Sequence, residues 1–255
     1  MAEVVGLLHP GEMGAAIGAV LRQRGVEVVW ASAGRSDATA SRAGAADLTD
    51  AGSVQTLARE ADVILSVCPP HAAREVAAAF GGFDGVYVDA NAVSPATVRA
   101  IAGSFTRFAD GGIVGPPPTE DSPTHLYLSG AEAAHVAALF AESPVDARVV
   151  SDSVGDASAV KATYAAWSKG SAALLLAIRE VARAEGIEET LRAEWHESIP
   201  SLADRLASAE RSAQAQGWRW VGEMDEIADT FAAAGEPDGF HRAAAEVFRR
   251  YERMF

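Results

Sequence analysis

The residues best suited to chemistry lie near the amino terminus, between an apolar run and a helical pattern. After Val4–Leu8 the chain reads His9-Pro10-Gly11-Glu12-Met13-Gly14. This stretch nearly matches G-x-G-x-x-G, with His9 at the first glycine position. Gly11 lets the backbone approach a pyrophosphate, Gly14 lets the helix pack closely on the strand, and the helix N-terminus offers free N–H groups. These six residues predict dinucleotide binding rather than an ordinary tight turn.

The residues after the second apolar run predict which dinucleotide is bound. A carboxylate about 20 residues beyond the glycine pattern holds the ribose 2′-hydroxyl of NAD. The chain has no carboxylate there before Asp37 and offers Ser32, Arg35 and Ser36 instead. A guanidinium and hydroxyls suit a 2′-phosphate. We therefore expect NADP (NADPH) as cofactor; the competing interpretation is that Arg35 is a solvated loop residue.

Polar and small residues also follow two later predicted strands. Asn91 lies at the edge where open α/β sheets bind ligands, and its amide can hold a carboxamide by both of its groups. Ser94 precedes a proline and is typical of a helix N-cap. Cys68 and Pro69 are expected beside the cofactor. No base accompanies Cys68, so it is not expected to act as a nucleophile.

A lysine on a long helical pattern is the candidate acid or base. Lys161, Tyr164, Ser168 and Ala172 share one helix face at spacings of three and four. Partial desolvation there would lower the pKa of Lys161 into a useful range. The competing interpretation is a surface lysine whose stem covers apolar surface. Tyr164, one turn away, is a second candidate for the proton role.

These residues need elements to position them, and apolar runs alternate with helical patterns over the first 150 residues. Such continuous apolar runs are typical of a parallel sheet covered on both faces. The predicted strands are Val4–Leu8, Val26–Trp30, Val63–Val67, Val86–Asp89, Phe105–Ala109, Leu126–Leu128 and Val149-Val150. The predicted helices between the first five are Met13–Arg24, Ser53–Glu60, Ala72–Phe80 and Pro95–Ala102.

Only helical patterns follow from about Ser153. They cover Ala157–Ala184 and then residues 188–197, 199–216, 223–234 and 239–253, with Gly217 and Gly235 as breaks. We predict an α/β Rossmann-type domain over residues 1–152, followed by an all-α domain over residues 153–255 for substrate binding and dimerisation.

Composition excludes several classes of protein. The formal net charge is −14, from 35 acidic and 21 basic residues, so no basic stripe is present to bind nucleic acid or an anionic membrane. The first residues do not resemble a signal peptide, and no apolar run is long enough to span a bilayer. A single cysteine fits a reducing compartment, and we expect a cytoplasmic protein. Cys and His residues lack metal-ligand spacing, so no metal is expected.

Five stretches together resemble the β-hydroxyacid dehydrogenases, which include 6-phosphogluconate and 3-hydroxyisobutyrate dehydrogenases and, more distantly, imine reductases. The stretches are Val5–Gly14, Asp62–Pro69, Asp89–Pro95, Asp110–Pro116 and Gly155–Lys161. The resemblance implies that Asn91 lies beside the nicotinamide and that Lys161 is the catalytic acid/base. Residues Trp218–Met224 and Gly239–His241 resemble a little-characterised branch with its own C-terminal domain.

The resemblance also implies substrate contacts, and here the chain departs from the family. Val114, Gly115 and Pro116 fall in the family's substrate loop, but Val114 replaces a serine and Pro116 a glycine. Ala165 replaces an asparagine that positions substrate. These changes disfavour a simple 3-hydroxyacid, and a phosphosugar is not expected either. From the helical domain, the residues expected to line the substrate pocket are Trp218, Met224 and His241.

The function that we predict is an NADP-dependent oxidoreductase. It would transfer a hydride to or from a carbonyl, hydroxyl or imine of a small metabolite, with Lys161 as proton donor or acceptor. The alternative is an NADP-binding sensor or regulatory protein without turnover. We also expect a homodimer formed through the helical domain, because the long helix with Leu174-Leu175-Leu176 is apolar over most of its surface.

Overall fold

The computed structural model describes residues 3–251 and divides by contacts into two compact units. Met1–Lys161 form the sheet unit and Ala162–Phe255 the helical unit. The predicted domain boundary after residue 152 falls at the end of the last strand, whereas the contact division follows Lys161. Met1 and Ala2, part of the predicted absence of a signal peptide, lie outside the described residues, as do residues 252 and 253 of the last predicted helix.

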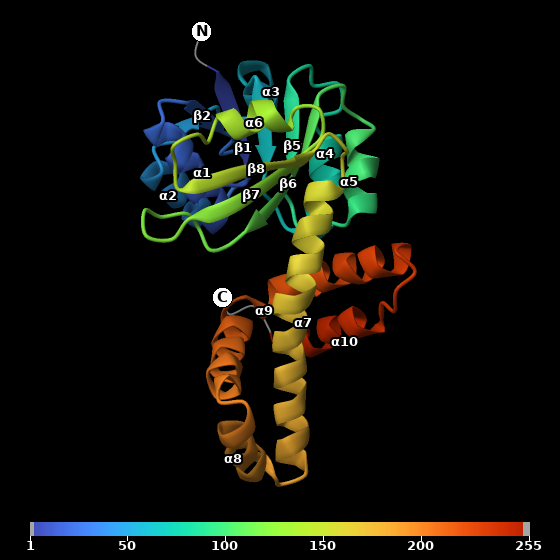
Figure 1. The fold of residues 1–255 in the computed structure, drawn as a ribbon. Helices are drawn as coiled ribbons and strands as arrows, with labels where there is room; N and C mark the ends of the chain where they lie inside the picture. The colour runs from blue at the N-terminus through green and yellow to red at the C-terminus, as the bar shows by residue number, and fades with distance from the viewer. Residues whose placement is uncertain (1–2, 252–255) are drawn as a thin grey trace. The chain divides into compact units, whose positions relative to one another are not determined.

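The sheet unit is built on an eight-stranded sheet in the order β3-β2-β1-β4-β5-β6-β7-β8 (Figure 1). The strands are β1 Val4–Leu8, β2 Glu27–Trp30, β3 Thr49–Asp50, β4 Val63–Ser66, β5 Val86–Asp89, β6 Phe108–Val114, β7 Thr124–Ser129 and β8 Val145–Ser151. Neighbours from β3 to β6 pair in parallel, and β8 pairs in parallel with β7. The prediction of a Rossmann-type domain followed by helices is confirmed.

Strand β7 corrects the expectation of a purely parallel sheet, because it pairs antiparallel with β6. Only the loop of residues 115–123 joins these two strands, which is too short for the crossover that a parallel pair requires. Helix α2, strand β3 and helix α6 were not predicted. Each is short, and the two helices bury few residues.

Helices cover both faces of the sheet (Figure 1). Alternate strand residues point to opposite faces, so in β5 Val86 and Val88 join one apolar cluster and Tyr87 the other. The first cluster is covered by α1 Glu12–Gln23, α2 Asp37–Ala45 and α6 Ala133–Ala138. The second is covered by α3 Val54–Glu60, α4 Ala73–Ala78 with the short 3₁₀ turn η1 Pro70–Ala72, and α5 Pro95–Ala102.

Strand β6 begins later and ends later than predicted. The sequence predicts a strand at Phe105–Ala109, but β6 covers Phe108–Val114 and all seven of its residues are buried. The pair Gly111-Gly112 belongs to the strand rather than to a loop. A Cβ on Gly111 would lie 3.1 Å from the Ala90 Cβ, and one on Gly112 would lie 2.6 Å from the Ala157 carbonyl oxygen. These glycines therefore allow neighbouring elements to pack directly on β6.

The helical unit contains most of α7 Asp156–Ala184, together with α8 Glu188–Ser198, α9 Ser201–Ala233 and α10 Gly239–Phe248. The predicted helices 199–216 and 223–234 are one continuous helix, so the predicted break at Gly217 is wrong. A Cβ on Gly217 would lie 3.0 Å from the Tyr251 Cβ, and the glycine is therefore a close-packing position within α9. Leu176, Leu206, Met224 and Phe248 form the centre of the apolar core.

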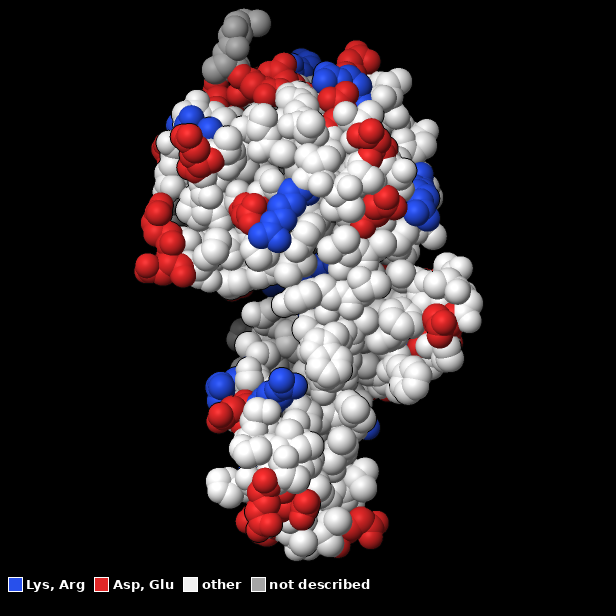
Figure 2. All heavy atoms as spheres, in the orientation of Figure 1, with Lys and Arg blue, Asp and Glu red and all other residues white. Residues whose placement is uncertain are grey.

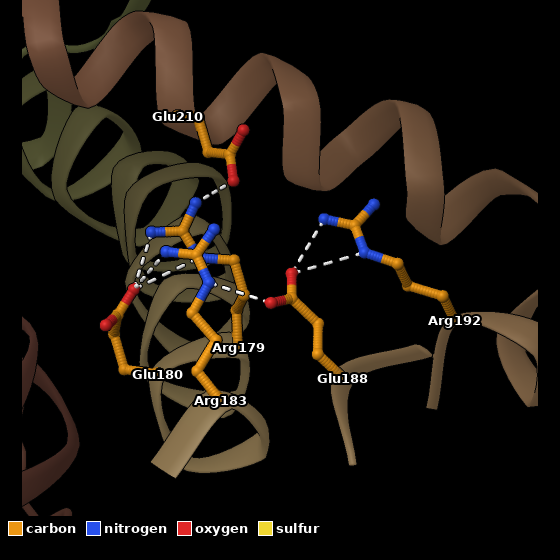
Figure 3. A network of polar contacts seen from close by, with 6 residues as sticks. All are labelled: Arg179, Glu180, Arg183, Glu188, Arg192 and Glu210. Atoms are coloured by element: carbon orange, nitrogen blue, oxygen red, sulfur yellow. Dashed lines mark hydrogen bonds and ion pairs between the residues drawn. The ribbon is translucent and has the colours of Figure 1, made fainter. Parts of the chain in front are cut away.

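A network of ion pairs joins α7, α8 and α9 (Figure 3). Arg179, with its side chain 13% exposed, pairs with Glu210 of α9 and with Glu180 on its own helix. Arg183 of α7 and Arg192 of α8 both bond the Glu188 carboxylate, at 2.8 and 2.9 Å. The network fixes the turn between α7 and α8 and ties it to α9.

Candidate active site

The glycine-rich turn connects β1 to α1 at the carboxyl edge of the parallel strands. Gly11 caps α1 in an extended conformation, and no side chain in the described part of the protein caps this helix end. A Cβ on Gly14 would lie 2.7 Å from the His9 carbonyl oxygen, so only glycine fits there without movement. The first N–H groups of α1 are therefore left for an anion, as a dinucleotide pyrophosphate requires.

His9 takes the left-handed conformation that a glycine would adopt without strain, with φ +63°. Its carbonyl oxygen accepts a hydrogen bond from the Gly11 N–H at 2.7 Å. Its Nδ1 is buried, and no described residue provides it with a partner. Desolvation, assisted by the nearby positive charge of Arg35, lowers the pKa of His9 to about 4. The imidazole at this turn is thus neutral at physiological pH.

The loop after β2 holds the residues predicted to select the cofactor. The Arg35 guanidinium forms no hydrogen bond or ion pair with any residue between 3 and 251. The Ser36 hydroxyl caps α2 by accepting from the Thr39 N–H at 3.3 Å. Arg42, which the sequence analysis missed, donates to the Pro10 carbonyl at 3.3 Å and ties α2 to the glycine-rich turn.

The structure also places a carboxylate near this loop, which the local sequence could not reveal. Asp50 of β3 accepts hydrogen bonds from the backbone N–H of Ser32 at 3.2 Å and of Gly52 at 2.7 Å. Desolvation opposes ionisation of Asp50, but the bonds from Ser32 and Gly52 outweigh it and lower the pKa. Asp50 therefore stabilises the loop itself and does not pair with the Arg35 guanidinium.

Asn91 and Cys68 are linked to each other at the ends of β5 and β4. The Asn91 side-chain oxygen accepts from the Cys68 N–H at 2.6 Å, and its amide nitrogen donates to the Ser66 hydroxyl at 3.1 Å. Asn91 is buried, and both groups of its amide are used in these bonds. The amide therefore holds the ends of β4 and β5 together. Burial raises the pKa of the Cys68 thiol to about 12, which agrees with a non-nucleophilic cysteine beside Pro69.

Asp110 is a buried residue of β6 for which the sequence predicts no role of its own. Its buried carboxylate accepts from the Gly155 N–H and the Ser158 N–H, both at 3.0 Å, and from the Ser158 hydroxyl at 2.6 Å. The Ser129 hydroxyl donates to it at 2.9 Å. Asp110 of β6 therefore caps the start of α7. The sequence feature that could have indicated this role is an aspartate within an otherwise apolar strand.

Lys161 lies one turn further along α7, against β6. A Cβ on Gly112 would lie 3.0 Å from the Lys161 Cβ, so the glycine brings the helix and the strand into direct contact. The Lys161 ammonium has no hydrogen bond or ion pair among the residues that the structure describes. Desolvation alone lowers its pKa to about 8. This is an acid/base group suited to work near neutral pH.

The other predicted substrate residues are distributed over both units. Val114 is the last residue of β6, whereas Gly115 and Pro116 are exposed in the loop that follows.

The helical unit contains Tyr164, the second candidate for proton transfer, and the remaining predicted substrate residues. Tyr164 is 53% exposed on α7, and Trp218 lies on α9 beside Arg219. His241 packs on Phe231 and is buried, with an Nδ1 that no described residue contacts by a hydrogen bond. Met224 has no exposed surface and is a core residue.

Two other kinds of feature are absent from the described residues. No cluster of His, Cys, Asp and Glu there could hold a metal ion. No helix over residues 3–251 combines the length and the apolarity that a membrane crossing requires.

Comparison with known proteins adds two family matches. Residues 4–92 match the family described as "NADP oxidoreductase coenzyme F420-dependent", and residues 182–251 match a domain of unknown function (DUF1932). An uncharacterised 28.5 kDa protein of Methanothermus fervidus is 28% identical over 190 residues, which cover 73% of this chain and 74% of that protein.

Solved structures show the same fold over nearly the whole chain. The conserved protein MTH1747, reported to be structurally similar to 3-hydroxyacid dehydrogenases, is 27% identical with a TM-score of 0.69, covering 97% of this chain and 96% of that one. Mycobacterium tuberculosis 3-hydroxyisobutyrate dehydrogenase has a TM-score of 0.73 at 15% identity, covering 98% and 94%. The reductive aminase of Aspergillus terreus has 0.61 at 16% identity, covering 98% and 93%.

The fold and the glycine-rich turn define a Rossmann-type sheet unit followed by a helical C-terminal unit. The resemblance to the β-hydroxyacid dehydrogenase superfamily is thereby confirmed. The match of the DUF1932 domain to residues 182–251 agrees with the predicted little-characterised branch.

Proposed function

We propose that the protein is an NADP-dependent oxidoreductase that reduces or oxidises a carbonyl, hydroxyl or imine group of a small molecule, with Lys161 as the proton donor or acceptor. The observation that carries this proposal is the position of Lys161. It is fixed on β6 by Gly112, its pKa is about 8, and no described residue neutralises its charge. An unpaired ammonium held this way is unusual unless it serves a ligand.

The residues of the sheet unit fit the predicted cofactor. The uncapped start of α1, and the tight turn that Gly14 allows against the His9 carbonyl group, suit a pyrophosphate. The unpaired guanidinium of Arg35 suits a 2′-phosphate. His9 offers a buried Nδ1 that still lacks a partner among residues 3–251. The match of residues 4–92 to an NADP oxidoreductase family supports the same choice.

When bound, NADPH supplies a hydride that forms the new C–H bond of the substrate. As the electron pair of the C=O or C=N bond moves onto the heteroatom, that atom needs a proton, and the Lys161 ammonium donates one. In the oxidative direction neutral Lys161 accepts the proton instead. Asp110 and Gly112 position the lysine by fixing the start of α7 on β6. Tyr164 remains the second candidate for the proton role.

Turnover of NADPH with a panel of ketones, 2-oxoacids and cyclic imines tests the proposal. Saturable oxidation of NADPH by any member would support an enzyme. Tight NADPH binding without turnover would instead favour the sensor that the altered substrate loop suggested. NADH is the matched control, because it lacks only the 2′-phosphate that Arg35 is proposed to bind.

We further propose that the protein is a cytoplasmic homodimer. Large apolar side chains are exposed along the helical unit, including Trp167 at 68%, Leu174 at 61% and Val181 at 63%. They recur at helical spacing on α7, and the surface over much of this helix carries no charged side chains in Figure 2. Exposed apolar side chains arranged in this way are expected to be buried against a partner in solution. We propose that the partner is a second copy of the chain.

A further inference from the structure

Helices α7 and α10 line a cavity within the helical unit, and its volume is about 320 Å³. The wall is apolar except for the Ser171 hydroxyl and the His241 imidazole, and no Asp, Glu, Lys or Arg of the described chain lines it. Trp167, Leu174 and Phe240 are the largest apolar side chains around it. Such a volume is at the lower end of the range for small-molecule sites, and a wall without charges favours an uncharged ligand.

The cavity lies on a different side of α7 from the proposed proton donor. Gly170 of the cavity wall follows Lys161 by nine residues on the same helix. Nine residues make about two and a half turns of an α-helix, so these two residues lie on opposite sides of α7. A molecule in the cavity would therefore be a second ligand and not the substrate that exchanges a proton with Lys161.

His241 places an unsatisfied polar atom in this apolar surrounding. The residue is 7% exposed, and its buried Nδ1 has no hydrogen-bond partner among residues 3–251. The imidazole packs on the Phe231 ring at a centroid distance of 4.3 Å, which fixes its orientation. Burial lowers the pKa of His241, so the imidazole is neutral at physiological pH. A buried polar atom without a partner is costly, and a ligand that bonds to it gains affinity.

Gly170 leaves room beside this nitrogen. A Cβ at position 170 would lie 3.7 Å from both the Nδ1 and the Cε1 atom of His241. Alanine would thus fit at an ordinary contact distance and would favour the helix more than glycine does. The glycine keeps open the place from which a ligand atom can approach Nδ1.

The wall suits an organic molecule better than water. A buried water molecule needs roughly two to four polar partners. Here the Ser171 hydroxyl already donates to the Ser168 carbonyl oxygen at 3.5 Å, which leaves Nδ1 of His241 as the main polar group. A single hydroxyl can donate to or accept from an imidazole nitrogen and so satisfies Nδ1 in either tautomer. Trp167 and Phe240 offer aromatic surface to a ring.

We propose that the cavity between α7 and α10 binds a small uncharged molecule of the phenol class, whose hydroxyl bonds His241 and whose ring lies against the apolar wall. In this assignment His241 holds a second ligand, so the proposal does not depend on the oxidoreductase reaction. Trp167 and Leu174 also belong to the stripe proposed to contact a second copy of the chain. A side chain of that copy is the competing occupant, and binding measurements separate the two.

Three compounds of similar size test the proposal: 4-methylphenol, toluene, which lacks the hydroxyl, and 4-methylbenzoate, which carries a charge. Calorimetric titration of the full chain should show one saturable site for 4-methylphenol. Its affinity should be at least threefold higher than that of toluene, because of the bond to His241, and at least tenfold higher than that of 4-methylbenzoate, whose charge would be buried without a partner. Equal affinity of toluene would overturn the proposal. So would the absence of saturable 4-methylphenol binding, which is the outcome if a second copy fills the cavity.

Gly170→Ala tests where the ligand lies. The added methyl group should lower the affinity for 4-methylphenol at least tenfold, while Tm stays constant or rises because alanine favours the helix. Gly44→Ala is the matched control, because Gly44 lies within α2 and a Cβ there would meet nothing within 4 Å. It should leave the affinity unchanged. Unchanged affinity in Gly170→Ala would refute the proposed site.

His241→Phe tests the hydrogen bond. The variant keeps an aromatic ring beside Phe231 but removes Nδ1, so 4-methylphenol and toluene should bind with equal affinity. A preference for 4-methylphenol that persists in this variant would contradict the role given to His241. Gly170→Ala provides its test whether or not the His241 variant folds.

Discussion

Asp110 and Ser158 are joined by two hydrogen bonds, one from the Ser158 N–H at 3.0 Å and one from its hydroxyl at 2.6 Å. Through this pair the buried strand β6 holds the first turn of α7. Because Lys161 follows one turn later, the same contact sets the position of the proposed proton donor. A strand residue therefore positions a helix residue 51 places further along the chain.

Asp110→Ala should destabilise the protein strongly. The substitution leaves the Gly155 and Ser158 N–H groups buried without their acceptor, and such losses cost about 3 kcal/mol or more. Urea unfolding would measure the free energy of unfolding. Asp152→Ala, at an exposed position just before α7, is the control and should change it by less than about 0.5 kcal/mol. Equal effects of the two substitutions would refute the anchoring role of Asp110.

Arg35→Ala should remove the preference for NADPH over NADH. The guanidinium makes no other hydrogen bond or ion pair within residues 3–251, so its loss should leave the fold unchanged. Fluorescence titration should show NADPH affinity at least tenfold lower, about 1.4 kcal/mol, with NADH affinity nearly constant. Arg59→Ala, an exposed position on α3, is the control. Tighter or equal binding of NADH by the unmodified protein would reject NADP as the cofactor.

His9→Gly should stabilise the protein without cofactor while weakening NADPH binding severalfold. Glycine adopts the φ of +63° without the strain of about 1 kcal/mol that a side chain causes there. Glu142→Gly, at a second position with positive φ, should give a similar gain with no effect on NADPH. Thermal unfolding and NADPH titration of both variants separate strain from cofactor contact. If His9→Gly bound NADPH normally, His9 would not be a cofactor residue.

The same variant should change the pH dependence of stability. The folded pKa of His9, about 4, is below its ordinary value of 6.5. Between these two pH values the unfolded chain binds a proton that the folded chain does not, so stability falls as pH falls through this window. The His9→Gly variant lacks this group and should lose less stability between pH 6.5 and 4.

Trp167→Glu combined with Leu174→Glu should convert the proposed dimer into a monomer. A charge on each exposed apolar position of α7 would have to be buried in the interface without a partner. Light scattering should then give the chain mass of 26.5 kDa, against twice that mass for the unmodified protein. Ser198→Glu, at an exposed position of α8, is the control. A monomeric unmodified protein at micromolar concentration would contradict the proposed dimer.

The sequence was most informative where one local pattern has one structural meaning. The run from β1 through Gly14 predicted a strand, a tight turn and a helix, and all three are present. The sequence pattern gave the wrong element boundaries where a glycine allows close packing instead of ending a helix or strand. Gly217 lies inside α9 because Tyr251 fills the space beside it, and Gly112 lies inside β6 because α7 packs there. Neither neighbour can be identified from adjacent residues.

In the candidate site, too, local sequence predicts some features, whereas others depend on contacts between distant residues. Lys161 could be identified from its helix face and from the family resemblance, but its lowered pKa depends on burial against β6. The carboxylate of Asp50 reaches Ser32 only because β3 pairs with β2. The amide of Asn91 is held by Ser66 and Cys68, which are more than 20 residues away in the chain. Such long-range pairings require the folded sheet.

Lys161→Ala should lower kcat for the reduction of a ketone or imine by 10²–10⁴-fold, the usual range for general-acid help, with NADPH affinity nearly unchanged. Lys169→Ala is the matched control, because it also removes an ammonium from α7. Lys169 pairs with Glu223 and lies over the Trp220 ring, so this control should cost stability and retain kcat per folded molecule.

The pH dependence of kcat/KM for NADPH-dependent reduction tests the role of Lys161 most directly. Burial lowers the pKa of the Lys161 ammonium to about 8, and reduction needs the protonated form. In the unmodified protein kcat/KM should therefore be constant below pH 8 and fall as the pH rises through it, while the reverse oxidation rises over the same range. The Lys161→Ala variant should be slow and show no such change near pH 8. Near-full turnover with the same pH dependence in Lys161→Ala would contradict this account and assign the proton to Tyr164 or to water.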